Sequence, residues 1–185
     1  MVNARIAVLG LFALMAGLPA KAWELDGART LIAATRDGRE IPIGTVTFTP
    51  EGERARVAVA IDRSKFTDYF LSMREFKCLE DPTEVTCYVP YPYANPGWVT
   101  KTDFAWLEHA LLFLTKKPAE FGANLWNGLY FRMSLTDDGL IGEPRAVDLN
   151  QIAFPPDNLD VPPYGEADQG PVAEGAHWLT GLKIR

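Results

Sequence analysis

The feature that most constrains the fold is a pair of Asp-Gly dipeptides, Asp37-Gly38 and Asp138-Gly139, each set between two segments that can form strands. A two-residue Asp-Gly loop is the strongest short-range signal for a β-hairpin, because both central residues must tolerate positive φ. Apolar and polar residues alternate after the first dipeptide, over 45–49, and before the second, over 128–136. Such alternation is typical of half-buried strands, so the chain is expected to form antiparallel hairpins.

Further short strands are expected over 30–35, 56–61, 69–78, 85–89 and 178–184. Residues 69–78 carry apolar bulk on both faces, which indicates a central strand or one that lines an interior. One helix is expected between Thr100, a possible N-cap, and Pro118. Its nearly continuous apolar surface predicts burial against the sheet, with Glu108 and His109 in a narrow polar stripe.

These elements predict a mainly β fold. We expect a small antiparallel β-barrel or strongly curved sheet of calycin-like outline. One buried α-helix and a long Pro-rich C-terminal loop over 155–175 complete it. The similarity to calycins is one of shape alone, since no family motif is present.

The first 22 residues have the pattern of a cleaved signal peptide. Arg5 precedes an apolar run over 6–17, and Ala20-Lys21-Ala22 provides the small residues that signal peptidase requires. The run is shorter than the roughly 20 residues needed to span a bilayer. We therefore expect cleavage after Ala22, no transmembrane segment in the mature chain, a single β-rich domain over 23–185 and an exported, periplasmic location.

The charge of the chain argues against nucleic acid as a partner. The formal net charge is −6 at pH 7, and the expected signal peptide carries basic residues without acids, so its removal leaves a still more acidic domain. Binding to nucleic acid or to anionic lipid depends on clustered Lys and Arg, and the sequence contains no such cluster.

The two cysteines are expected to form a structural disulfide. Cys78 and Cys87 flank a short, turn-rich segment, Glu80-Asp81-Pro82-Thr83, as cross-strand partners in a hairpin would. Exported proteins commonly oxidise such pairs. The alternative is a redox or metal pair, but the spacing is much wider than C-x-x-C.

No catalytic, metal or cofactor residues are predicted. The two histidines, His109 and His177, belong to no metal motif, and His109 is expected at the surface. The serines outside the signal lack a nucleophile elbow or an S-x-x-K motif. Two carboxylate groups remain: Asp137-Asp138 fits a hairpin turn, and Asp157-Asn158 with Asp160 only weakly resembles a calcium loop.

Two groups of residues are candidates for binding. One is the stiff aromatic-proline segment that follows the fifth expected strand, with Tyr88, Tyr91, Tyr93 and Trp98. Its rings could contact a partner or fold back over one end of the sheet. The other group would line a ligand-filled interior: Phe70, Met73, Phe131 and Met133.

We therefore expect an exported, non-catalytic binding or accessory protein that holds a small apolar or amphiphilic ligand. One alternative is a protein-interaction module, an envelope assembly factor or an enzyme inhibitor, that uses the aromatic-proline segment. Another is a carboxylate-based hydrolase, which requires two acids facing one cleft. The sequence leaves the identity of the ligand or envelope partner, and the oligomeric state, open.

Overall fold

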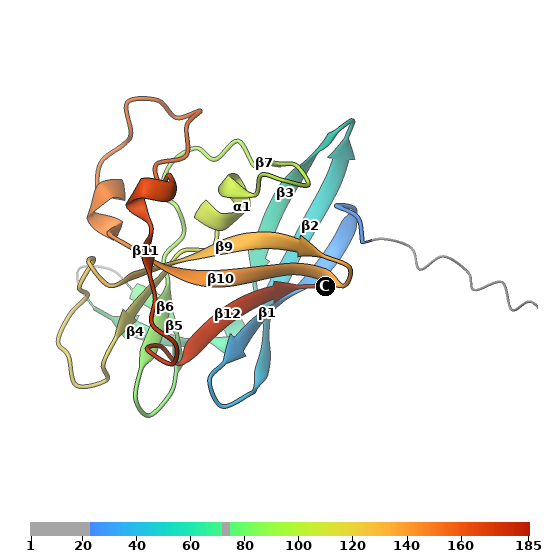
Figure 1. The fold of residues 1–185 in the computed structure, drawn as a ribbon. Helices are drawn as coiled ribbons and strands as arrows, with labels where there is room; N and C mark the ends of the chain where they lie inside the picture. Colours follow the sequence, from blue (N-terminus) through green and yellow to red (C-terminus); the bar gives the residue numbers. More distant parts are fainter. Residues whose placement is uncertain (1–22, 72–74) are drawn as a thin grey trace, which may run out of the picture.

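The computed structural model describes residues 23–71 and 75–185, and this part is built on one antiparallel sheet of 12 strands (Figure 1). The expectation of a mainly β fold is confirmed. The expected signal peptide and Met73 lie outside the described residues. In chain order the strands are β1 (Gly27–Thr35), β2 (Glu40–Glu51), β3 (Arg54–Ile61), β4 (Thr67–Phe70), β5 (Glu75–Glu80), β6 (Val85–Tyr88), β7 (Trp98–Val99), β8 (Phe113–Lys116), β9 (Gly128–Thr136), β10 (Gly139–Val147), β11 (Gly170–Pro171) and β12 (Leu179–Ile184).

Helical structure is limited to short segments. The only α-helix in residues 23–71 and 75–185 is α1 (Ala105–His109), and 3-10 turns cover Arg63–Lys65, Leu149–Ile152 and Glu166–Asp168. No helix in these ranges is long and apolar enough to cross a membrane.

The sheet is open. Its strands follow the order β4-β5-β6-β8-β9-β10-β12-β1-β2-β3-β7, with β11 attached to β10. β4 and β7 stand at the two ends, and no ladder joins them within residues 23–71 and 75–185, so the sheet of the described residues is not closed into a barrel. Figure 1 shows that the strand direction turns across the sheet: the β2–β3 hairpin runs at a steep angle to β9 and β10.

The two Asp-Gly hairpins are confirmed. β1 pairs with β2 and β9 pairs with β10, both antiparallel, and each reversal lies at its Asp-Gly dipeptide. The expected two-residue Asp-Gly loop with positive φ at both residues does not form, because no described residue other than glycine has positive φ and Gly139 already pairs with Thr136. Gly38 has a φ of 79°, which a side chain at this position would strain. In β2, Val46 and Phe48 are buried while the neighbouring threonines are exposed, as the alternation predicts.

The single strand expected over 69–78 is wrong. Two strands, β4 and β5, occupy this region and pair with each other, with Tyr69 opposite Phe76 and Phe70 opposite Glu75. Between Phe70 and Glu75 the sequence contains no Gly, Pro, Asn or Asp. Because those residue types are the strongest sequence signals for a turn, the pattern predicted one continuous strand over 69–78.

The long helix expected after Thr100 is also wrong, since α1 ends at His109 and Leu112–Lys116 turn into β8 and its approach. β8 pairs with β6, placing Phe113 opposite Tyr88 and Lys116 opposite Val85. A segment that is apolar on every side suits a buried strand as well as a buried helix. Here the strand forms because β6 offers an edge with which Phe113–Lys116 can pair.

The short helix fills a gap in the sheet. β8 and β9 pair only at Phe113–Leu129 and Leu114–Gly128, and α1 packs against β9 beyond that point. There the Glu108 carboxylate accepts the backbone N–H of Met133 at 2.6 Å. A side chain of α1 thus replaces a backbone acceptor of the missing strand pair.

Candidate functional site

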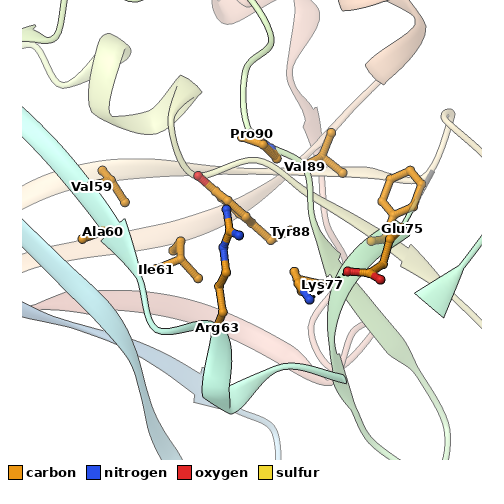
Figure 2. Close-up of a pocket in the computed structure, with 10 residues that line it drawn as sticks. Val59, Ala60, Ile61, Arg63, Glu75, Lys77, Tyr88, Val89 and Pro90 are labelled. Atoms are coloured by element: carbon orange, nitrogen blue, oxygen red, sulfur yellow. Dashed lines mark ion pairs between the residues drawn. The ribbon is translucent and has the colours of Figure 1, made fainter. Parts of the chain in front are cut away.

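A cleft opens where β3 faces the β5–β6 hairpin across the unclosed side of the sheet (Figure 2). Its volume is about 610 Å³, which lies within the range of small-ligand sites. The lining residues come from β3, the 3-10 turn that follows it, β5 and the end of β6: Val59, Ala60, Ile61, Arg63, Glu75, Phe76, Lys77, Tyr88, Val89 and Pro90.

The cleft exists because β7 covers only the first part of β3. Ladder pairs join Ala55 to Val99 and Arg56 to Trp98, and the N–H of Val57 donates to the Gly97 carbonyl at 2.7 Å. Past Val57, β3 has no neighbour on this side in the described residues. Three consecutive residues of one strand, 59–61, line the cleft. Since successive side chains point to opposite faces, the cleft must run along the strand edge.

The wall of the cleft is mostly apolar. Val59 and Ile61 belong to the inner face of β3 and are half-buried, while Phe76 and Val89 are buried on the opposite side. Tyr88 packs against Phe113 with ring centroids 5.7 Å apart, and its hydroxyl donates to the Ala110 carbonyl at 2.9 Å. Burial raises the pKa of Tyr88 to about 12, so this hydroxyl stays neutral.

Two cations stand at the mouth of the cleft, and only one of them is neutralised. Lys77 forms ion pairs with Asp68 and Glu75, and the hydrogen bond to Asp68 is the main cause that raises the pKa of Lys77. Arg63 has no side-chain hydrogen bond or ion pair with another described residue. Figure 2 shows the Arg63 side chain extending from the 3-10 turn into the cleft, towards Tyr88.

A second cavity, of about 240 Å³, continues the first. The two share Val59, Tyr88 and Pro90, and the second reaches α1 at Trp106 and Ala110. Tyr91 also lines it, and the Tyr91 hydroxyl is buried without a hydrogen-bond partner among the described residues. A buried donor left unpaired costs about 1–3 kcal/mol. A polar atom of a ligand or a bound water would recover that cost.

The structure distributes the aromatic-proline residues over several environments. Tyr91 is buried, with ring contacts to Trp106 and His109. Tyr93 is half-buried and donates to the Ile152 carbonyl at 3.2 Å. Trp98 lies outside the cleft, with the guanidinium groups of Arg54 and Arg56 at 3.8 and 3.9 Å from its ring centroid. Only Tyr88 and Tyr91 of these four candidates line the two cavities.

The residues expected to line an interior are not brought together at the cleft. Phe131 and Met133 are buried in the hydrophobic core, where Phe131 contacts Phe113. Phe70 is exposed at the end of β4, with 76% of its surface accessible. Met73 lies outside the described residues. Sequence alternation identified inward-facing residues correctly in β9, but it could not show where packing leaves space.

The surface position expected for His109 is wrong, because the side chain is fully buried. Its Nε2 accepts the backbone N–H of Tyr164 at 3.1 Å, so the proton must sit on Nδ1, which donates to the Ala105 carbonyl at 2.6 Å. Burial lowers the pKa of His109, and the imidazole is neutral. Tyr164 stacks on this ring and thereby anchors the segment that follows Ile152.

Glu108 is the carboxylate whose environment the sequence did not indicate. It is buried and its two oxygens accept from the Tyr130 hydroxyl and from the N–H of Met133. Burial raises its pKa, while these hydrogen bonds lower it in part. Glu108 does not line either cavity. A role in the structure of the β8–β9 gap accounts for all of its contacts.

No group of three or more potential metal ligands occurs within residues 23–71 and 75–185. The Asp157–Asp160 segment instead forms a local turn, in which Asn158 accepts the N–H of Asp160 at 2.9 Å. His177 pairs with Glu84 at 2.8 Å, and Glu84 also accepts the N–H of Trp178. These contacts attach the start of β12 to the β5–β6 turn.

Comparison with known proteins yields no relative: no family model, curated protein or solved structure matches this chain.

Proposed function

We propose that this chain is an exported, non-catalytic binding protein that holds a small apolar or amphiphilic ligand in the cleft between β3 and the β5–β6 hairpin. The observation that carries the proposal is the cleft itself, a space of about 610 Å³ with an apolar wall and an unpaired guanidinium at its mouth. Pockets that combine apolar walls with a few polar groups are typical of small-ligand sites.

The proposal also includes cleavage after Ala22 and a periplasmic location. It further includes a calycin-like outline with a long Pro-rich C-terminal loop over 155–175. The Cys78–Cys87 disulfide supports export, because such bonds persist in oxidising compartments. The intact mass of protein taken from the periplasm would test both the cleavage and the location, because it should match a chain that begins at Trp23.

The two alternatives have less support in the site. Interaction with an envelope protein through the aromatic-proline segment needs rings that are free, and Tyr91 is packed against α1. A carboxylate-based hydrolase needs two acids at one cleft. Glu75, the carboxylate that lines the main cleft, is instead ion-paired with Lys77.

The test is binding of 1-anilinonaphthalene-8-sulfonate, an apolar dye with one anionic group, followed by its fluorescence. Val59→Trp should fill the cleft and abolish the fluorescence increase. Ala58→Trp is the matched control, because Ala58 is the exposed neighbour on the opposite face of β3. Equal dye binding by both variants, with unfolding transitions like that of the wild type, would overturn the proposal. Native mass spectrometry of gently purified protein would then seek the natural ligand as an adduct.

A further inference from the structure

The edge of β3 in the cleft carries backbone groups that face away from β2. In an antiparallel ladder, alternate residues direct their N–H and C=O groups to the same side. The Val57 N–H donates to Gly97, on the side opposite β2. Val59 and Ile61 share the parity of Val57, so their N–H and C=O groups also face away from β2 and into the cleft.

These groups are unpaired. β3 pairs with β2 and, only at its first residues, with β7. None of the hydrogen bonds among the described residues involves the outward N–H or C=O groups of Val59 and Ile61. An exposed strand edge of this kind is a template for pairing with another extended chain. Native proteins commonly cover or twist away such edges, whereas this one borders a cleft.

We infer that the ligand of the cleft is an extended peptide segment that adds to the β3 edge and places an acidic group beside Arg63. The inference rests on the proposed function and specifies its ligand class. Main-chain hydrogen bonds to an edge strand give affinity in this mode of recognition, and pockets for alternate side chains give specificity.

The cleft provides both the main-chain hydrogen-bonding groups and the apolar contacts for side chains. The stretch from Val57 to Ile61 spans about 13 Å at roughly 3.3 Å per residue, which is room for about four residues of an added strand. Phe76, Tyr88 and Val89 face this edge across the cleft and offer apolar contacts to every second side chain. An acyl chain would fill the same apolar space but would leave the edge N–H and C=O groups without partners.

The charge of the cleft further defines which peptide segment would bind. Lys77 is neutralised by Asp68 and Glu75, so Arg63 is the cation at the mouth that lacks a counter-ion in the described part of the chain. A glutamate or aspartate of the bound segment would supply it. Arginine is suited to this task because its planar guanidinium can bind both oxygens of a carboxylate.

The probe is a fluorescent heptapeptide, acetyl-Glu-Val-Thr-Val-Thr-Val-Glu-amide, titrated by anisotropy. One control peptide has glutamine at both ends, and a second is N-methylated along its backbone. The peptide should bind, the glutamine control should bind at least fivefold more weakly, and the N-methylated control should not bind. With Arg63→Ala the advantage of the acidic peptide over the glutamine control should disappear.

The decisive variant is Val59→Pro. Proline removes the outward N–H of residue 59 without breaking a hydrogen bond to β2, and edge strands tolerate it. Val59→Ala is the matched control, because it loses the side chain and keeps the N–H. Val59→Pro should weaken peptide binding at least tenfold, and Val59→Ala by less than threefold. Hydrogen exchange of the wild type should show the Val59 and Ile61 amides protected when peptide is bound.

Other outcomes overturn the inference in distinguishable ways. Binding of the dye or of a fatty acid, without peptide binding, removes the inference and leaves the proposed function standing. Peptide binding without protection of Val59 and Ile61 also removes it, because the β3 edge is then not the site. Failure of the dye, the fatty acid and the peptide together overturns the proposed function as well.

Discussion

At the scale of residues, Glu108 and His109 show how two neighbouring polar side chains can organise a buried region. Glu108 ties α1 to β9 through Met133, and His109 ties α1 to Tyr164 in the long segment after Ile152. Their types alone suggested a solvated stripe, because Glu and His are usually exposed. Burial is tolerated here since each polar atom has a partner.

The His109 pKa leads to a prediction about pH. The pKa is lowered by burial in the folded protein and has its ordinary value of 6.5 in the unfolded chain. As pH falls below 6.5 the unfolded chain therefore takes up this proton before the folded protein does. The free energy of unfolding falls over this range, until pH has passed through the folded pKa. His109→Gln preserves an acceptor for the Tyr164 N–H and does not titrate. The free energy of unfolding should fall more steeply on acidification from pH 7 to 5 in the wild type than in this variant.

Glu108 provides a check on that interpretation, because its shift has the opposite sign. Its pKa is raised by burial, so the folded protein takes up this proton first and gains stability as pH falls. Glu108→Gln should therefore steepen the loss of stability on acidification, while His109→Gln should flatten it. Parallel pH profiles for the wild type and His109→Gln would show that His109 does not titrate with unfolding.

At the scale of elements, the β5–β6 hairpin was more predictable from the sequence than the elements on either side of it. Cys78 lies directly opposite Cys87, and the pair forms the predicted disulfide. Turn residues between two cysteines define a register without help from the rest of the fold. The β4–β5 reversal and the α1–β8 boundary lack such local signals, and the sequence misassigned both.

The disulfide is expected to stabilise the hairpin through the entropy of the closed loop. Its two cysteines are 9 residues apart, for which the loop-entropy model gives about 2.5 kcal/mol. The double variant Cys78→Ala/Cys87→Ala should lose about this much free energy of unfolding in urea denaturation. Reductant should lower the melting temperature of the wild type and leave that of the double variant unchanged. A wild-type melting temperature that ignores reductant would contradict the expected contribution.

At the scale of the whole molecule, function is expected where the sheet fails to close. β7 covers the start of β3, and β4 lies at the other end of the strand order. The C-terminal half of β3 therefore borders a cleft instead of a strand. The expected alternatives of a closed barrel and a curved sheet differ at this edge. The same edge supplies the proposed binding site.

The open edge predicts a period-two pattern of hydrogen exchange in the free protein. The Val59 and Ile61 amides face the cleft and should exchange rapidly, whereas the Ala58 and Ala60 amides face β2 and should be protected. The contrast should exceed tenfold in exchange rate at neutral pH. Uniform protection over 58–61 would mean that another strand, or a second copy of the chain, covers the edge in solution.

The local features of this protein follow from its sequence alone. Asp-Gly dipeptides, alternating residues and the spacing of the cysteines are short-range signals. They predicted the β1–β2, β5–β6 and β9–β10 hairpins, the disulfide and the mainly β class. Tyr88 was also named among the candidates, although for the aromatic segment and not for the cleft.

Three features depend on the tertiary fold: which strand edge stays unpaired, where Leu112–Lys116 leave the helical path and which polar side chains are buried. Each of these depends on contacts between segments far apart in the chain, such as β6 with β8 and His109 with Tyr164. Alternation states which way a side chain points, but not whether another strand meets it. The cleft is the space left by a missing strand pair, and no local pattern of residues encodes that absence.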